Sequence, residues 1–232
     1  MIGKNAAITG TVASILLASA AARAQDAAAQ PPAAAALRTA PPPGGGDTDH
    51  DGVVGHIGVT VFPTQAIPFP VAAANVTAPV VGVRYWLMPN LGFDGGLGIG
   101  WYTGSGPSPF AMAFHAGVPI ALASTKHFTF LVTPEANLAF AHMNTPVPGM
   151  PNTTADGFLF DMGARVGAEI QFGFIGIPQL ALQGSVGLLF THAETNTNAA
   201  GMPSTHANNL TTTVGASPWA IFANAIQATY YL

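Results

Sequence analysis

The chain has 232 residues, of which 49% are hydrophobic and only 7% are charged, and it contains no cysteine. Soluble domains average about 25% charged residues, so this chain lacks the side chains that normally cover a surface in water. The absence of cysteine excludes disulfides and thiolate metal sites. Six Lys and Arg residues are too few for the basic face that nucleic-acid binding needs, so we expect no nucleic-acid partner.

The N-terminus has the features of a cleaved signal peptide. Lys4 supplies a short positive region, residues 6–20 are apolar and small, and Ala22 and Ala24 flank Arg23 in a small-x-small cleavage pattern. The apolar run is shorter than the roughly 20 residues of a transmembrane helix, which makes an uncleaved membrane anchor the weaker alternative. We therefore predict that residues 1–24 direct export and are removed.

Residues 25–52 are rich in Ala, Pro and Gly, a composition that cannot bury a core and that predicts a flexible periplasmic tether. Asp47, Asp49 and Asp51 near its end match the opening of a calcium-binding loop. Gly58, however, stands where such a loop needs a bidentate glutamate. We expect a solvated acidic junction there, and neither a metal nor any other cofactor.

From residue 53 onward, apolar residues alternate with small or polar ones in runs of about ten residues separated by turn residues. A membrane-spanning barrel strand has about 9–11 residues and this alternation. The pattern predicts an all-β fold, an antiparallel up-and-down transmembrane barrel of about eight strands over residues 53–232. Pro119 and Pro134 fall inside runs, where a bulge or a shortened strand is expected. The runs are 53–62, 80–88, 91–102, 110–122, 128–141, 158–174, 180–191 and 219–232.

The charged residues of these runs fall on one face, among many glycines and alanines. This composition indicates the crowded interior of a narrow barrel, with the apolar face outward in lipid. Residues that lie at equal distances before and after a hairpin turn face each other across the two strands. This counting predicts that Arg84 faces Asp94 and that Glu169 faces Gln183. The same counting predicts that His115 faces Glu135. The expected interior polar network is Arg84, Asp94, His115, Glu135, Asp161, Arg165 and Glu169.

The Trp and Tyr residues lie near the ends of the runs, which is typical of the aromatic girdles at the two membrane interfaces. The connections also alternate between short and long. The long ones, 63–79, 103–109, 142–157 and 192–218, are expected at the outer surface, and the short ones in the periplasm. The expected interface aromatics are Tyr85, Trp86, Trp101, Tyr102, Trp219, Tyr230 and Tyr231.

The chain resembles the small eight-stranded outer-membrane barrels, namely the OmpA-, OmpX- and OmpW-type proteins and the broader outer-membrane β-barrel domain family. The resemblance covers residues 53–232 and rests on the hairpin at 82–100, the segment at 128–141 and the closing strand at 219–232. It implies location in the outer membrane of a Gram-negative cell envelope. Such chains usually end in an aromatic residue read by the barrel-assembly machinery, whereas this chain ends in Leu232.

Two functions remain open from the sequence. One is a structural or surface-interaction barrel whose interior is closed by the polar network; the other is a porin-like narrow pore for small solutes or hydrophobic compounds. The interior charges favour the first, because about eight strands leave a lumen that side chains just fill. The expected partners are outer-membrane lipids and, through the C-terminal strand, the barrel-assembly machinery, and we expect a monomer.

Some small barrels of this kind modify lipids with His, Ser and carboxylate groups near the outer rim. The nearest set here is Thr191, His192 and Glu194, with His142 and Ser217 on other segments. These residues show no fixed spacing of nucleophile, base and acid. We therefore predict that the protein is not an enzyme.

Overall fold

The computed structural model describes residues 48–68, 75–103, 106–147, 149, 151–199, 202–213 and 226–232. These residues form β-strands and two short 3-10 helices, η1 (Asp51–Val53) and η2 (Gly173–Ile175). No helix within the described ranges is long and apolar enough to cross a membrane. The signal peptide, most of the tether and the start of the last predicted strand, including Trp219, lie outside the described residues.

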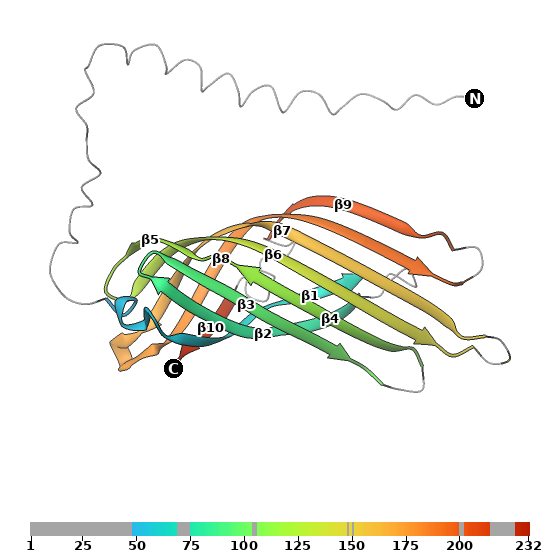
Figure 1. The fold of residues 1–232 in the computed structure, drawn as a ribbon, viewed down its shortest axis with the longest axis horizontal. Helices are drawn as coiled ribbons and strands as arrows, with labels where there is room; N and C mark the ends of the chain where they lie inside the picture. The colour runs from blue at the N-terminus through green and yellow to red at the C-terminus, as the bar shows by residue number, and fades with distance from the viewer. Residues whose placement is uncertain are drawn as a thin grey trace, which may run out of the picture. The chain divides into compact units, whose positions relative to one another are not determined.

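The described strands belong to one antiparallel sheet, shown in Figure 1. Neighbours in sequence pair in order from β1 to β4, and β5 continues the line of β4 beside β6. The strands are β1 (Ile57–Pro68), β2 (Asn75–Met88), β3 (Leu91–Trp101), β4 (Ser108–Gly117), β5 (Ile120–Ser124), β6 (Phe128–Thr145), β7 (Thr153–Phe172), β8 (Ile177–Thr197), β9 (Thr205–Thr212) and β10 (Ile226–Tyr231).

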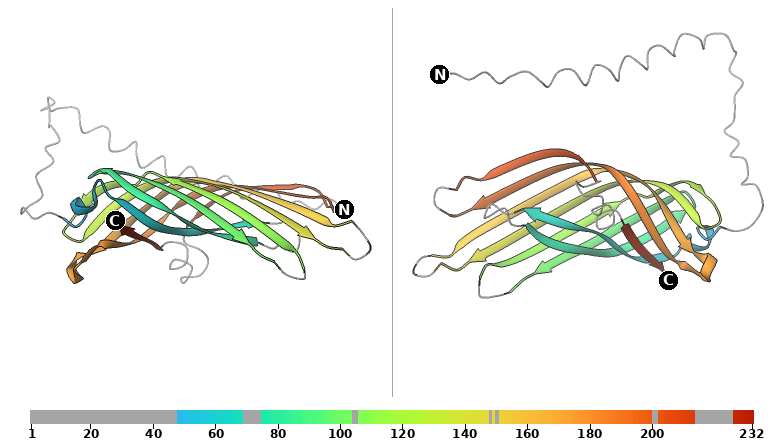
Figure 2. Two further views of the ribbon diagram at one scale, coloured as in Figure 1. Left: turned by 60° about the horizontal axis from the view of Figure 1, so that its bottom comes forward. Right: turned by 180° about the vertical axis from the view of Figure 1, so that it is seen from behind.

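The sheet closes on itself through β10, which pairs with β1 on one side and with β8 on the other (Figure 2). The circuit therefore has eight strand positions, with β4 and β5 sharing one, and the predicted all-β closed barrel of about eight strands is confirmed. β9 pairs with the part of β8 beyond that covered by β10. Closure leaves no free edge along the β1–β10–β8 seam where these strands pair.

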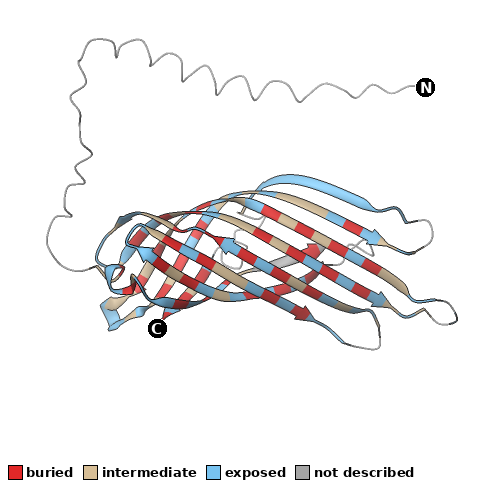
Figure 3. Cartoon of the chain, viewed as in Figure 1, coloured by how far each residue is buried: buried red, intermediate tan, exposed pale blue. Residues whose placement is uncertain are grey.

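Alternation along each strand separates the inside of the barrel from the outside, as the buried and exposed stripes in Figure 3 show. On β1, Val59 and Val61 are exposed, while Gly58 and Thr60 are buried. On β7, Met162 and Val166 are exposed, while Asp161, Arg165 and Glu169 are buried. The apolar face therefore points outward and the face that carries the charges points inward, as the sequence pattern predicted.

Several strands are longer than the predicted runs. β6 and β7 extend into the expected loop 142–157, and β8 with β9 fills much of 192–218. β1 and β2 likewise occupy parts of 63–79. The apolar alternation stops before the backbone pairing does, because Thr and Asn side chains support pairing without needing lipid. The connections within 142–157 and 192–204 are therefore shorter than expected from the sequence.

The predicted first strand began too early. Residues 51–53 form η1, Gly55 adopts a positive φ of 82°, and β1 starts only at Ile57. That φ lies in the left-handed region that glycine tolerates best, so the chain turns there before it enters the barrel. The irregularity expected at Pro119 is present, because Val118 and Pro119 separate β4 from β5. The one expected at Pro134 is wrong, because β6 continues through Pro134, which is opposite Ala164 in an unshifted register.

We predict that Gly96→Ala destabilises the barrel. A Cβ built at Gly96 would lie 2.7 Å from Val80 Cγ1 and 3.0 Å from Phe62 Cδ2 inside the barrel. Such overpacking costs about 1–3 kcal/mol of the free energy of unfolding, measurable by urea titration in lipid vesicles. Gly184→Ala is the matched control, because its Cβ would meet nothing within 4 Å. Equal stability of the two variants would contradict the packing described here.

Candidate functional site

Arg84 lies at the centre of a hydrogen-bonded cluster that crosses the barrel interior. From β2, its Nε and Nη2 donate to the two carboxylate oxygens of Asp94 on β3, each at 2.7 Å. Its Nη1 donates to Oε2 of Glu169 on β7 at 2.6 Å and to Oε1 of Gln183 on β8 at 2.7 Å. All four side chains are buried. We call Arg84, Asp94, Glu169 and Gln183 the Arg84 cluster.

Strand register explains half of this cluster. Arg84 is directly opposite Asp94, and Glu169 is directly opposite Gln183, the two pairings expected from the sequence. The link between the two pairs crosses the lumen and was not predicted. Sequence counting identifies neighbours on adjacent strands, whereas contact across a barrel depends on how it closes.

Arg165 forms a second buried ion pair. Its Nε donates to Oε1 of Glu135 at 2.6 Å, and the two side chains are 8% and 5% exposed. Asp161 lies on the same inward face of β7, opposite Asn137 on β6 and Thr191 on β8. The structure thus places these three residues of the expected network inside the barrel.

The expected pairing of His115 with Glu135 is wrong. His115 is opposite Asn137, and its Nδ1 lies 2.7 Å from Asn137 Oδ1, while Gly117 faces Glu135. The hairpin closes on the pair Ser124 and Thr129, and a bulge follows in β5, so the register differs by two residues from simple counting. His115 is nevertheless buried on the inward face.

Trp86 and Tyr231 are not interface aromatics, contrary to the sequence prediction. Both are buried inside the barrel, and Trp86 Nε1 donates to Tyr231 Oη at 2.9 Å. Arg84 Cζ lies 5.9 Å from the centroid of the Trp86 ring, within the range of a cation–π contact. Position near a strand end had suggested the interface, but the alternation of each strand turns these two side chains inward.

The segment just before β1 closes the same end of the barrel. The His50 ring meets the Trp86 ring edge-on with centroids 4.5 Å apart, and His50 Nε2 lies 2.7 Å from the carbonyl oxygen of Pro89. Oδ2 of Asp49 accepts from His127 Nδ1 at 2.7 Å and from the backbone N–H of Gly173 at 3.1 Å. We call residues 48–56 the basal segment.

The basal segment is bonded to all three short turns, those between β2 and β3, β5 and β6, and β7 and β8. The acidic junction is therefore packed against the barrel and not simply solvated, which corrects the sequence prediction. Asp49 accepts hydrogen bonds from His127 and Gly173, and Asp51 accepts them from the backbone N–H and the hydroxyl group of Thr48. Asp47 lies outside the described residues.

The other half of the interior is apolar, a feature that the sequence analysis missed. Phe62 stacks against His115, with ring centroids 4.2 Å apart, where the polar and apolar parts meet. The alternation predicted an inward position for members inside the expected runs, such as Val80 and Ala113, but others, such as Ile67 and Met143, lie in stretches expected to be connections. The buried apolar cluster contains Phe62, Ile67, Val76, Ala78, Val80, Ala111, Ala113, Ala139, Ala141, Met143, Ala155 and Leu159.

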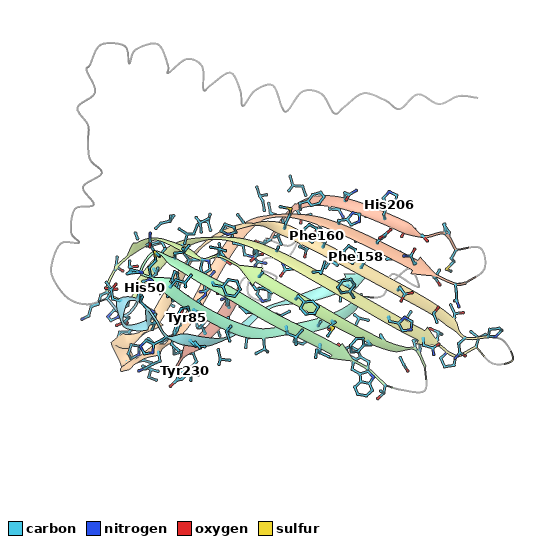
Figure 4. The ribbon with its side chains drawn as sticks, viewed as in Figure 1. His50, Tyr85, Phe158, Phe160, His206 and Tyr230 are labelled. Carbon is cyan, nitrogen blue, oxygen red and sulfur yellow. The ribbon has the colours of Figure 1, made fainter. Side chains whose placement is uncertain are left out.

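The outside of the barrel carries a belt of exposed apolar side chains on strands β1–β8 and β10. Four of the expected interface aromatics lie on this outer side: Trp101, Tyr102 and Tyr230 are exposed, and Tyr85 is partly exposed. Tyr85 and Tyr230 are near the end that carries the basal segment (Figure 4). Members of the belt include Val59, Val83, Leu97, Ile99, Phe114, Phe130, Phe140, Met162, Val166, Val186, Leu188, Phe190 and Ile226.

Two histidines of the rim set considered for catalysis lie among the described residues and contact neighbouring strands. His142 Nδ1 lies 2.7 Å from Asp156 Oδ1, and His192 Nδ1 lies 2.7 Å from Asn208 Oδ1. Each histidine is thus held by an acid or an amide on the neighbouring strand. Ser217 lies outside the described residues. In the described part of the rim, the Nδ1 atoms of His142 and His192 thus face an acid and an amide and not the hydroxyl group that a nucleophile–base pair needs.

Neither a family model nor a curated protein matches the sequence. Among solved structures, the chain is similar to a major outer membrane protein from Thermus thermophilus, with a TM-score of 0.39 and 10% sequence identity. The match covers 76% of this chain and 98% of that chain. A similarity of this size carries no functional argument.

We predict that Arg84→Ala lowers the free energy of unfolding by about 3–5 kcal/mol, because it leaves two buried carboxylates without their counter-charge. Urea titration of the protein refolded in lipid vesicles measures this loss. Lys126→Ala removes an exposed cation from a turn and should change the free energy of unfolding by about 0.5 kcal/mol or less. Similar losses in both variants would show that the Arg84 cluster contributes no special stability.

Proposed function

We propose that the protein is an integral outer-membrane β-barrel with a closed interior and a structural or surface-interaction role. The observation that carries this proposal is the inversion of polarity: exposed side chains around the barrel are apolar, whereas Arg84, Asp94 and Glu169 are buried inside. A water-soluble barrel of this kind would expose far more apolar area than a soluble monomer tolerates. A lipid environment satisfies both faces, since lipid meets the belt and the backbone groups are paired within a closed sheet.

Two layers of different chemistry support a closed interior. The Arg84 cluster joins opposite walls near the basal segment, and the apolar cluster fills the lumen beyond Phe62. Between them lies a cavity of about 10 Å³, lined by residues that include His115, Arg165 and Gln227. That volume holds about one water molecule. Opening a path for solutes would require both layers to move.

The surface-interaction role is supported by the strands that extend beyond the apolar belt. Every residue of β9 is exposed, and its sequence is rich in Thr and Asn. The β6–β7 and β8–β9 pairs continue as hydrogen-bonded ladders up to Thr145 and Thr195. Such ladders would present polar groups on a rigid support at the outer surface. A non-catalytic role, monomeric assembly, export by the N-terminal segment and recognition by the barrel-assembly machinery are parts of the same proposal.

We predict that lipid covers the belt. Because the chain has no cysteine, single cysteines can be introduced at will. Val83→Cys, exposed on the outward face of β2, should resist a membrane-impermeant maleimide in vesicles and react after detergent solubilisation. Asn144→Cys, exposed on β6 beyond the belt, should react in both conditions. Rapid labelling at residue 83 in intact vesicles would exclude the membrane-spanning orientation.

We predict that the refolded protein shows no discrete single-channel openings in a planar bilayer. Arg84→Ala should also remain silent, because the apolar cluster still fills the lumen after the polar layer is weakened. A heat-modifiable gel shift checks that each sample is folded. Openings in the unsubstituted protein that change with Arg84→Ala would favour the alternative function of a narrow pore gated by the Arg84 cluster.

A further inference from the structure

The outward face of the barrel contains a groove at the border between the apolar belt and the polar outer part. Its volume is about 530 Å³, and it runs across β4, β6, β7 and β8. On the belt side it is lined by Phe110, Met112, Phe140 and Phe158. Phe140 and Phe158 form a tilted pair with ring centroids 5.4 Å apart. Figure 4 shows Phe158 on β7, towards the end of the barrel that also holds His206.

The other side of the groove is polar. Two residues further from the belt on the same strand face, β6 carries His142 next to Phe140, and β7 carries Asp156 next to Phe158. His142 and Asp156 are bonded to each other and remain 53% and 60% exposed. Glu194 and Asn196 complete this side from β8. A groove with an aromatic floor in the belt and polar walls just beyond it matches an amphiphile that lies in the membrane interface.

The charges of the groove select the kind of head group. Asp156 and Glu194 are exposed acceptors, and the sequence after Lys126 contains only one Lys or Arg residue, Arg165, which is buried in the lumen. A phosphate head group needs Arg or Lys, which this wall lacks. Carboxylates, an amide and a histidine instead offer acceptors and donors for the hydroxyl groups of a sugar.

We propose that this groove binds a membrane glycolipid, with its sugar head group against Asp156, Glu194 and Asn196 and its acyl chains along Phe110, Phe140 and Phe158. The proposal rests on the membrane orientation proposed above. It requires no metal and no chemical step. Affinity would come from hydrogen bonds to carboxylates at the interface and from contact of acyl chains with the aromatic floor.

The test uses the full chain refolded in detergent micelles and native mass spectrometry. The two probes are monoglucosyl diacylglycerol and phosphatidylglycerol with the same acyl chains. We expect the glucolipid to be retained about tenfold more, as one hydrogen bond to a charged group would give. The combined Asp156→Asn and Glu194→Gln variant should abolish that preference, and Phe158→Ala should lower retention of the glucolipid.

Phe130→Ala is the matched control, because it removes an exposed aromatic from the belt outside the groove and should change neither result. Asn196→Ala provides a milder change if the double variant fails the gel-shift test of folding, and it should reduce the preference. Equal retention of the two lipids would overturn the proposal. So would a preference that survives all the groove variants, or stronger retention of phosphatidylglycerol that depends on Mg²⁺. Val83→Cys labelling tests the membrane orientation on its own. A wrong orientation can therefore be distinguished from a correct orientation without glycolipid binding.

Discussion

The neutralisation of one buried guanidinium organises much of this barrel. Arg84 is fully buried, and an arginine cannot discard its charge, so the lumen must supply acceptors at the positions its N–H groups reach. It obtains them from β3, β7 and β8 and thereby ties opposite walls of the barrel together. Small inward residues around it are a consequence, because a long side chain crossing a narrow lumen leaves little space for others. Trp86 then packs beneath the guanidinium and joins it to the basal segment.

The interior divides into two parts that contribute differently. Near the short turns, charged and hydrogen-bonding groups fix a unique arrangement, since each donor needs a particular acceptor. Towards the opposite end, alanines and a few larger apolar residues fill the lumen without directional bonds. The outside of the barrel shows the complementary pattern, apolar along the belt and polar beyond it. Polarity is therefore arranged along the barrel as well as across its wall.

Much of this architecture could be predicted from the sequence because alternation is a local property. The inward position of Arg84, Glu135 and Glu169 follows from the alternation of each strand alone. The Arg84–Asp94 pairing was obtained by symmetric counting about Pro89, and it holds because a register shift between Trp86 and Met88 offsets the tighter closing pair Met88–Leu91. The same counting fails for His115, because the closing pair Ser124–Thr129 and the bulge in β5 together leave the register two residues away from the symmetric one. Trp86 shows that two sequence signals can disagree. Its place near a strand end suggested the membrane interface, whereas the alternation of its strand already indicated the lumen.

The remaining differences arise from interactions that are distant in sequence or independent of hydrophobicity. The basal segment looked like a solvated tether because its contacts with Pro89, His127 and Gly173 join residues far apart in the chain. The link from Arg84 to Glu169 has the same origin. Strand extensions beyond the belt were missed because Thr- and Asn-rich ladders lack the apolar signal from which membrane strands are recognised.

The long reach of the Arg84 cluster has a consequence for the order of assembly. Asp94 is 10 residues from Arg84 and can pair with it within a single hairpin, whereas Glu169 is 85 residues away. An isolated β7–β8 hairpin in hydrocarbon would hold Glu169 without its counter-charge, at a cost of several kcal/mol. For the membrane-spanning barrel proposed above, this cost disfavours the entry of separate hairpins into the bilayer one after another. Charge compensation would instead couple insertion to closure, which is completed when Tyr231 of the last strand meets Trp86, 145 residues earlier.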